Sequence, residues 1–196
     1  MTCDEKAGTT PTECSITLRP LEVEDLDFLA DLANDPGVRE NVVDWGWPVS
    51  RSLQERWFYG PAQSSNTFRF VVLNENEERI GVGILSSVDW RNRSASVGLK
   101  IGGPSAARGK GYGALVVNAL TEFAFQDMGL HKVHASILAS NRASQRVFVD
   151  KCGWSVEGIR REHVWRHGRY DDVVEVGILV SQSTALSTPG TPERFH

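Results

Sequence analysis

A cluster of glycines and cations stands directly before an apolar helical pattern. The stretch ARGKGYGALVVNALTEFAF interleaves its cations and glycines in the order Arg108, Gly109, Lys110, Gly111 and Gly113. Glycine permits sharp backbone turns and lets a ligand come close to the main chain. The N-terminus of the helix that follows offers unpaired N–H groups and the positive end of a dipole. Together these features predict an anion-binding loop, most often one for phosphate.

Three phosphate-binding patterns can be compared with this loop. A Walker A loop needs Ser or Thr after its Gly-Lys pair, and here another glycine follows Lys110. A dinucleotide-binding pattern can be drawn through residues 109–114, but it follows a run of strands and the next strand ends without a carboxylate for a ribose. The third pattern is Arg-x-x-Gly-x-Gly, over residues 108–113. A glycine-rich turn without a ligand is the remaining alternative.

The elements expected around the loop alternate in an α/β order. Helices are expected in LEVEDLDFLADLAND before Pro36, in SRSLQERWFYG after a cap at Ser50 or Ser52, in the apolar run that ends before Gly129, and in NRASQRVFVDKCG from Asn141 to Gly153. Strands are expected at 15–20, 67–73, 79–90, 94–102 and 131–138, and in WSVEG, REHVWRH and DDVVEVGILV. This order predicts a mixed sheet, an antiparallel meander followed by one parallel crossover in its middle.

Length and composition indicate one globular domain. The chain has 196 residues, 40% of them hydrophobic and 23% charged, which is ordinary for a domain with its own core. We expect a flexible leader over 1–14, the domain over 15–181 and a flexible tail over 182–196. No apolar run approaches the roughly 20 residues that span a bilayer, and no secretory signal is recognised.

Charge and cysteine content narrow the class of partner. The net charge is −4, whereas nucleic-acid-binding proteins are more often basic, so no nucleic-acid partner is expected. Three unpatterned cysteines, Cys3, Cys14 and Cys152, favour reduced thiols in a cytoplasm-like compartment and argue against a zinc site. We therefore expect a cytoplasmic protein with no metal and no membrane partner.

Five stretches, in this order along the chain, resemble the GNAT superfamily of acyl-CoA-dependent N-acetyltransferases. They are LRPLEVEDLDFLADLAND, DWRNRSASVGLKIG, ARGKGYGALVVNALTEFAF, GLHKVHASILASNRASQRVFVDKCGW and EGIRREHVWRHGRYDDVVEVGIL. The family signature Q/R-x-x-G-x-G/A corresponds to residues 108–113, and the likeness runs from about Ile16 to Val180. Within the superfamily the chain looks most like the RimJ/RimL group, which includes ribosomal-protein N-terminal acetyltransferases. The resemblance implies a GNAT fold, in which a central parallel pair of strands splays apart and helices flank the sheet.

The resemblance also implies a site for acetyl-CoA. The coenzyme A pyrophosphate would lie on the loop and helix start, formed by Arg108, Gly109, Lys110, Gly111, Tyr112, Gly113 and Ala114. The pantetheine arm would pair with the fourth strand at Leu99 and Ile101, in the cleft made by the splayed strands. Asn141 and Ser144 would bind the arm near the thioester, although Asn141 could equally be a plain helix cap.

The family reaction requires a proton acceptor and a proton donor. A neutral amine attacks the thioester, a main-chain N–H of the fourth strand stabilises the oxyanion, and a thiolate leaves. Many relatives have a tyrosine as the acid where this chain has Phe148, so Ser144 is the remaining candidate, with a solvated helix serine as the alternative. Glu162 is the first candidate for the base, ahead of His163 and Asp89, with a non-catalytic surface glutamate or a water chain as the alternatives.

Acceptor specificity in this fold comes from the segment between the first two strands. Its aromatic and acidic residues suit a cationic amine beside apolar surface, and we expect Asp44 and Trp45 to contact it, whereas Trp57 and Phe58 are expected to pack on the sheet. The acceptor could be a protein α-amine, a polyamine, an amino sugar or an antibiotic. A non-catalytic acyl-CoA-binding module and, more remotely, a nicotinamide-binding protein are the alternatives. Relatives commonly form dimers, so a homodimer is possible.

Overall fold

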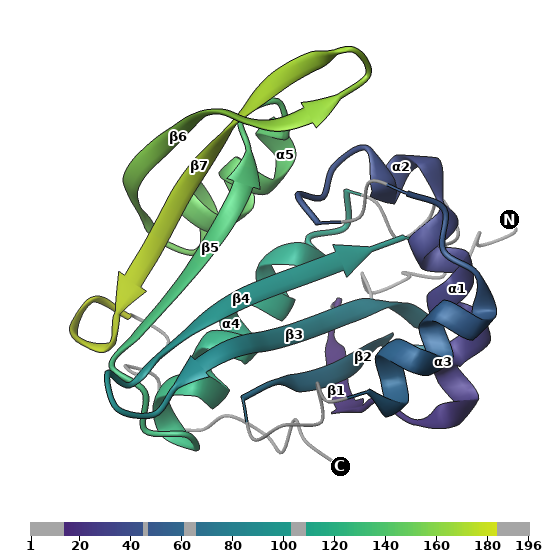
Figure 1. The fold of residues 1–196 in the computed structure, drawn as a ribbon. Helices are drawn as coiled ribbons and strands as arrows, with labels where there is room; N and C mark the ends of the chain where they lie inside the picture. Colours follow the sequence, from purple (N-terminus) through teal and green to yellow (C-terminus); the bar gives the residue numbers. More distant parts are fainter. Residues whose placement is uncertain (1–13, 45–46, 61–65, 103–108, 184–196) are drawn as a thin grey trace, which may run out of the picture.

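The computed structural model describes residues 14–44, 47–60, 66–102 and 109–183, and one seven-stranded sheet organises them (Figure 1). The strands lie in the order β1-β2-β3-β4-β5-β7-β6. Their bounds are β1 Ile16–Pro20, β2 Phe68–Asn74, β3 Arg79–Asp89, β4 Ser94–Ile101, β5 Lys132–Leu138, β6 Ser155–Arg166 and β7 Arg169–Leu179. The helices are η1 Val23–Asp25, α1 Leu26–Asn34, α2 Pro36–Arg39, α3 Arg51–Tyr59, α4 Tyr112–Gln126, α5 Arg142–Gln145, η4 Arg146–Lys151 and η5 Val180–Gln182.

The sheet is antiparallel except at its centre, as the sequence predicts. Tight turns join β2 to β3, β3 to β4 and β6 to β7, and each contains a residue with positive φ: Glu77, Arg93 and His167, the last followed by Gly168. The crossover through α4 returns the chain in the same direction, so β4 and β5 pair in parallel.

The parallel pair holds together at one end only. The ladder joins Ser94, Ala95 and Ser96 of β4 to β5, and among the described residues the rest of β4 has no strand partner on that side. Figure 1 shows the two strands meeting at one end and diverging toward the end where α2 and α5 lie. The predicted splay of a central parallel pair is therefore confirmed, and it leaves a main-chain edge of β4 available to a ligand.

Alternation along the strands separates the two faces of the sheet. Ala95 and Val97 of β4 are buried in the larger core beneath α4, with Val116 and Leu120 of that helix. The opposite face packs against α1 and α3 through a smaller core that includes Leu29 and Val82, at the side where Ser96, Gly98 and Lys100 point. The face beneath α4 thus carries the larger core, whereas the opposite face carries polar side chains beside its smaller core.

Helix boundaries follow local capping chemistry. Ser50 Oγ accepts the Leu53 N–H and begins α3, as predicted. Pro36 does end the first helical run, but it also begins α2, with the Asp35 side chain as the cap. The predicted helix after Asn141 exists as α5 continued by η4, a π-helical turn, before Gly153 at positive φ.

The end of the chain differs from expectation in one respect. WSVEG and REHVWRH were expected as separate strands, and they form the single long strand β6, whose pairing with β7 shifts register twice. Bulges let one strand absorb extra residues without ending, which a sequence pattern alone does not distinguish from a loop. The predicted leader and tail lie almost wholly outside the described residues.

Candidate functional site

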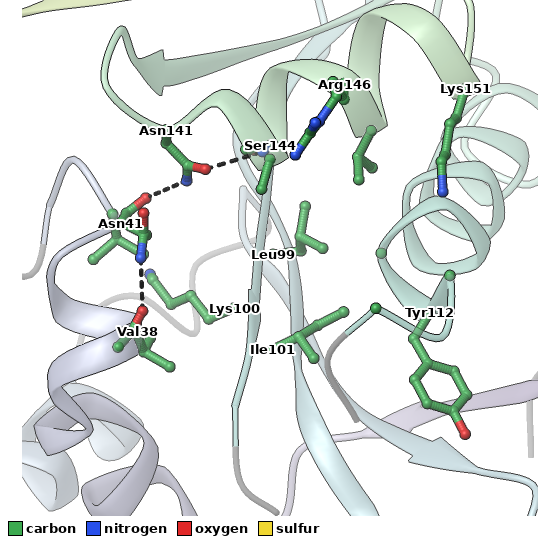
Figure 2. Close-up of a pocket in the computed structure, with 17 residues that line it drawn as sticks. Val38, Asn41, Leu99, Lys100, Ile101, Tyr112, Asn141, Ser144, Arg146 and Lys151 are labelled. Carbon is green, nitrogen blue, oxygen red and sulfur yellow. Dashed lines mark hydrogen bonds between the residues drawn. The ribbon is translucent and has the colours of Figure 1, made fainter. Parts of the chain in front are cut away.

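Two adjoining cavities occupy the space between the splayed strands. Their volumes are about 640 and 480 Å³. Six residues line both cavities, which places a common wall between them: Asn41, Val42, Leu99, Lys100, Asn141 and Ser144. A molecule in the first cavity can therefore meet a molecule in the second beside these shared residues. Figure 2 shows the lining of the first cavity, with Leu99, Asn141 and Ser144 of the shared set labelled.

The first cavity has the features of an anion site. Gly109 and Gly111 adopt positive φ values of 82° and 92°, and Gly111 is the residue from which α4 begins. The charged side chains on its described lining are Lys100, Arg146 and Lys151, without a carboxylate. A helix N-terminus surrounded by cations attracts phosphate groups.

The structure brings together most of the predicted donor-site residues. Those that line the first cavity are Leu99, Ile101, Gly109, Gly111, Tyr112, Gly113, Asn141 and Ser144. Lys110 and Ala114 adjoin these residues in the chain but do not line the cavity. Lys110 is exposed, and the Ala114 N–H donates to the Gly111 carbonyl in the first turn of α4. Arg108 lies outside the described residues.

Tyr112 contributes main chain rather than side chain to this cavity. Figure 2 shows its ring pointing away from the other labelled residues. The ring is buried, and its hydroxyl donates to the Glu75 carboxylate at 2.7 and 2.9 Å. That hydrogen bond raises the pKa of Tyr112 to about 12. The phenol therefore anchors the start of α4 and stays a proton donor to Glu75 at neutral pH.

Asn141 ties two elements of the site together. Its Oδ1 accepts the Ser144 N–H at 2.9 Å, so it caps α5, and its Nδ2 donates to the Asn41 carbonyl at 2.8 Å (Figure 2). Ser144 consequently stands at the common wall of the cavities. Phe148 is only 2% exposed, packs edge-on against Trp154 and offers no proton to either cavity.

The second cavity lies on the polar face of the sheet. Its floor comes from β2 to β5 and includes Arg69, Ile84, Ser86, Ser96, Gly98, Lys100 and Ser136, while Val42, Asp44 and Trp57 cover it. A Cβ added at Gly98 would have no atom within 4 Å, so this glycine leaves the floor open. Asp44, predicted to contact the acceptor, lines this cavity, and Trp45 falls outside the described residues.

Lys100 is a site residue that sequence reasoning missed. It is 7% exposed, lines both cavities, and its Nζ lies 3.1 Å from Asp44 Oδ2. Burial lowers its pKa although the carboxylate beside it acts in the opposite direction. The available signal was a lysine between apolar residues near the end of a strand, where a buried charged side chain is unusual unless it is paired.

The other titratable candidates lie away from both cavities. Glu162 is exposed in the bulge of β6, at a φ of 50°, where its N–H donates to Asp172 Oδ1. His163 lies 2.7 Å from the Arg160 guanidinium on the same strand. Asp89 accepts two hydrogen bonds from Asn92, which lower its pKa. Neither cavity is lined by any of the three predicted candidates.

The β6–β7 hairpin nevertheless reaches the segment that covers the second cavity. Arg166 donates to the carbonyls of Arg39 and Val42, the first at 2.9 Å. Burial lowers the pKa of Arg166. The segment that carries Asn41 and Asp44 is thus held from two sides, by this arginine and by Asn141.

Neither a metal centre nor a membrane span emerges from the described ranges. Within them no three His, Cys, Asp or Glu side chains come close enough together to hold a metal ion. None of the helices described is long and apolar enough to cross a membrane.

Comparison with known proteins identifies the family. The model of the acetyltransferase (GNAT) domain matches residues 15–155. A spermidine N(1)-acetyltransferase of Vibrio cholerae is 28% identical over 168 residues, covering 85% of this chain and 94% of that protein. The crystal structure of spermidine N-acetyltransferase from Vibrio cholerae with CoA and spermine has a TM-score of 0.78 at 27% identity, over 85% of this chain and 96% of that one. A dodecameric structure of the Vibrio cholerae enzyme has a TM-score of 0.72 at 28% identity, over 85% and 94%.

The family match covers more than half of the chain, and the fold, the splayed strands and the anion-binding loop agree with it. The dinucleotide and Walker alternatives for the loop are set aside by the same match. This chain belongs to the GNAT acetyltransferases and is an acetyl-CoA-dependent N-acetyltransferase that acts on amines.

Proposed function

We propose that the chain transfers the acetyl group of acetyl-CoA, bound in the first cavity, to a small primary amine bound in the second. The observation that carries this proposal is the common wall, at which Leu99, Lys100, Asn141 and Ser144 line both cavities. A thioester and an amine can meet there and react by direct attack in a ternary complex. A cavity of about 480 Å³ suits a small molecule.

The donor would be held mostly by main chain. The free edge of β4 at Leu99 and Ile101 can pair with the amides of the pantetheine arm, as an added strand would. The loop and helix start over 108–114 would bind the pyrophosphate, with Arg146 and Lys151 adding positive charge. Asn141 would contact the arm near the thioester.

The proton transfers remain with the groups predicted from sequence. Ser144 stands at the common wall and would protonate the leaving thiolate. Glu162 would accept the proton of the amine, and since it lies outside both cavities the proton would travel through water. A main-chain N–H of β4 would stabilise the oxyanion.

We propose further that the acceptor is a small amine rather than a protein α-amine. Two of the relatives named above are a spermidine acetyltransferase and its complex with spermine, which supports a small amine. The resemblance to the RimJ/RimL group supports a protein α-amine, which would have to reach the same wall with its terminal residue. The volume of the second cavity, about 480 Å³, favours the small amine.

The domain bounds, the cellular location and the oligomeric state are further parts of the proposal. The domain would span 15–181 between a leader and a tail, and the free thiols of Cys14 and Cys152 support a cytoplasmic location.

Exposed apolar residues on β6, such as Val156 and Ile159, support self-association, with a homodimer as the simplest form. One Vibrio cholerae structure is a dodecamer, so light scattering should measure the mass directly.

Release of free CoA thiol from acetyl-CoA tests the function. The panel would contain diamines, spermidine, amino acids, amino sugars, an aminoglycoside and short peptides, with an acceptor-free control. Turnover with a small amine is the expected result. Acetyl-CoA binding without turnover across the panel would overturn the proposal, and Glu162→Gln and Ser144→Ala then test the two proton-transfer roles on the best acceptor.

A further inference from the structure

The second cavity carries a surplus of positive charge. The charged side chains on its described lining are Arg69, Lys100 and Asp44. Asp44 pairs with Lys100 at 3.1 Å, so those two charges largely offset each other. Arg69 is left as the charge that the cavity itself does not balance. A polyamine in this cavity would add further positive charges beside it.

Arg69 is held in a defined position, and no residue in the described part of the chain serves as its counterion. Its guanidinium lies over the Trp57 ring, 3.9 Å from the ring centroid. Its Nε is buried and makes no hydrogen bond within the described residues, which also offer it no carboxylate partner. Burial lowers the pKa of Arg69. A buried guanidinium N–H that lacks an acceptor is costly, and such a group commonly marks a place where a ligand binds.

The surroundings of Arg69 suit a planar anion. Arg69 of β2, Ile84 of β3 and Gly98 of β4 lie in one row across the sheet, because Ile84 pairs with both of the others. Gly98 has no side chain, and this leaves the floor of the second cavity open beside the row. Hydroxyls of Thr67 and Ser86 line the same cavity. Stacking on Trp57 fixes the plane of the guanidinium, and an arginine so held can bind a carboxylate through two parallel hydrogen bonds.

We propose, on the basis of the proposed transferase function, that the acceptor is a small amine that also carries a carboxylate, and that Arg69 binds this carboxylate. The surplus of one positive charge matches one negative charge on the acceptor. The carboxylate then directs the amine toward the common wall at Ser144, while the Lys100–Asp44 pair lies beside the amine's path. Acceptor selection thereby excludes amines that are cationic throughout.

Binding to the CoA-loaded protein tests this inference independently of catalysis. Calorimetry would compare amines in pairs that differ only by the carboxylate: ornithine with 1,4-diaminobutane, lysine with 1,5-diaminopentane, and phenylalanine with 2-phenylethylamine. We expect the carboxylated member of at least one pair to bind about tenfold or more tightly, as one charge-assisted contact provides. Equal or tighter binding of the diamines or of spermidine, or no binding of any carboxylated member, would overturn it.

Variants then assign the preference to Arg69. Arg69→Gln is expected to weaken binding of the carboxylated amine about tenfold or more and to leave its decarboxylated counterpart unchanged, with Arg69→Lys intermediate. Arg56→Gln, an exposed α3 arginine outside the cavity lining, is the matched control and should change neither. A preference that survives in Arg69→Gln with unchanged thermal stability contradicts the assignment.

Thiol release on the same pairs separates the two proposals. Carboxylated amines that bind through Arg69 but are not acetylated would leave the Arg69–carboxylate contact standing and overturn the transferase proposal for the site. Acetylation of diamines in preference to amino acids would support the transferase proposal and overturn the inference that the acceptor carries a carboxylate.

Discussion

At the residue scale, Gly98 leaves open the floor of the second cavity, where we propose that the acceptor binds. Its added Cβ would meet no atom, and strand positions accept β-branched side chains, so Gly98→Val should fold normally. The valine would fill the floor of the second cavity, and we expect kcat/KM for the acceptor to fall about tenfold or more, while acetyl-CoA affinity and Tm stay close to wild type.

Gly158→Val on β6 is the matched control, because its added Cβ is equally free of neighbours and the residue lies outside both cavities. Steady-state kinetics and calorimetry with acetyl-CoA provide the two measurements. Wild-type kinetics for Gly98→Val would mean that the acceptor enters elsewhere.

Gly111 combines a conformational and a binding requirement. At a φ of 92° an alanine is strained by about 1 kcal/mol, and its methyl would stand at the start of α4 where phosphate is expected. Gly129 has a φ of 65°, equally open space and a position past the end of α4, so Gly129→Ala carries the strain alone. We expect similar losses of unfolding free energy in both variants and about tenfold weaker acetyl-CoA binding only in Gly111→Ala.

At the scale of elements, a buried carboxylate joins β1, η1 and β3. Asp25 has no exposed side-chain surface, pairs with Arg19 at 2.7 Å and Arg79 at 3.1 Å, and accepts the Glu22 N–H. Burial acts to raise its pKa, but the hydrogen bonds and the two arginines outweigh it and lower the pKa below 3.8. Asp25 therefore stabilises the fold fully above pH 3.8, and this contribution is lost as pH falls through the lower folded-state value.

Asp25→Asn should cost about 3 kcal/mol of unfolding free energy at pH 7, because it leaves two arginines without their shared partner. The difference from wild type should be constant down to about pH 4 and shrink below it. Urea unfolding over a pH series measures this. Asp27→Asn, whose pair with Arg51 is exposed on both sides, should change stability by less than about 1 kcal/mol at any of these pH values.

The hairpin of β6 and β7 positions the wall of the second cavity through Arg166. Removing its hydrogen bonds to the Arg39 and Val42 carbonyls should loosen the segment that carries Asp44. Arg166→Met is expected to raise the KM of the acceptor severalfold and to leave the KM of acetyl-CoA unchanged. Arg169→Met, at the exposed position paired with it across the hairpin, should leave both unchanged. Equal kinetics in the two variants would remove the hairpin from acceptor binding.

At the scale of the whole molecule, local chemistry was the predictable part. The glycine loop, the caps at Ser50 and Asn141 and the parallel crossover each follow from residues adjacent in sequence, and the structure contains them. Trp57 packs on the sheet as expected. These features depend on backbone conformation and periodicity, which a sequence displays directly.

The pairing of distant side chains was not predictable. Lys100 meets Asp44 across 56 positions, and the stacking of Arg69 on Trp57 depends on where α3 lies over the sheet. The bulge that places Glu162 on an exposed stretch of β6 follows from strand register, which no local pattern specifies. The glycine-rich loop proposed for the donor could therefore be predicted from sequence, whereas the charge of the second cavity could not.

Donor binding should change the whole molecule measurably. An arm paired along residues 97–101 supplies the β4 edge with the partner that β5 does not provide. Acetyl-CoA should raise Tm in proportion to the logarithm of its concentration above Kd, and hydrogen exchange should slow at the amides of 97–101 more than in β1 or β2. Uniform protection, or none at 97–101, would contradict pairing along this edge.

The short ladder between β4 and β5 has a further consequence for the life of the protein in a cell. Three residue pairs carry the main-chain continuity of a seven-stranded sheet, with α4 packed across the junction. Proteases act on chains that open transiently, and a donor paired with β4 would hold this junction closed. The half-life of the enzyme would then follow the supply of acetyl-CoA, so that starvation for the donor lowers both the rate of each molecule and the number of molecules.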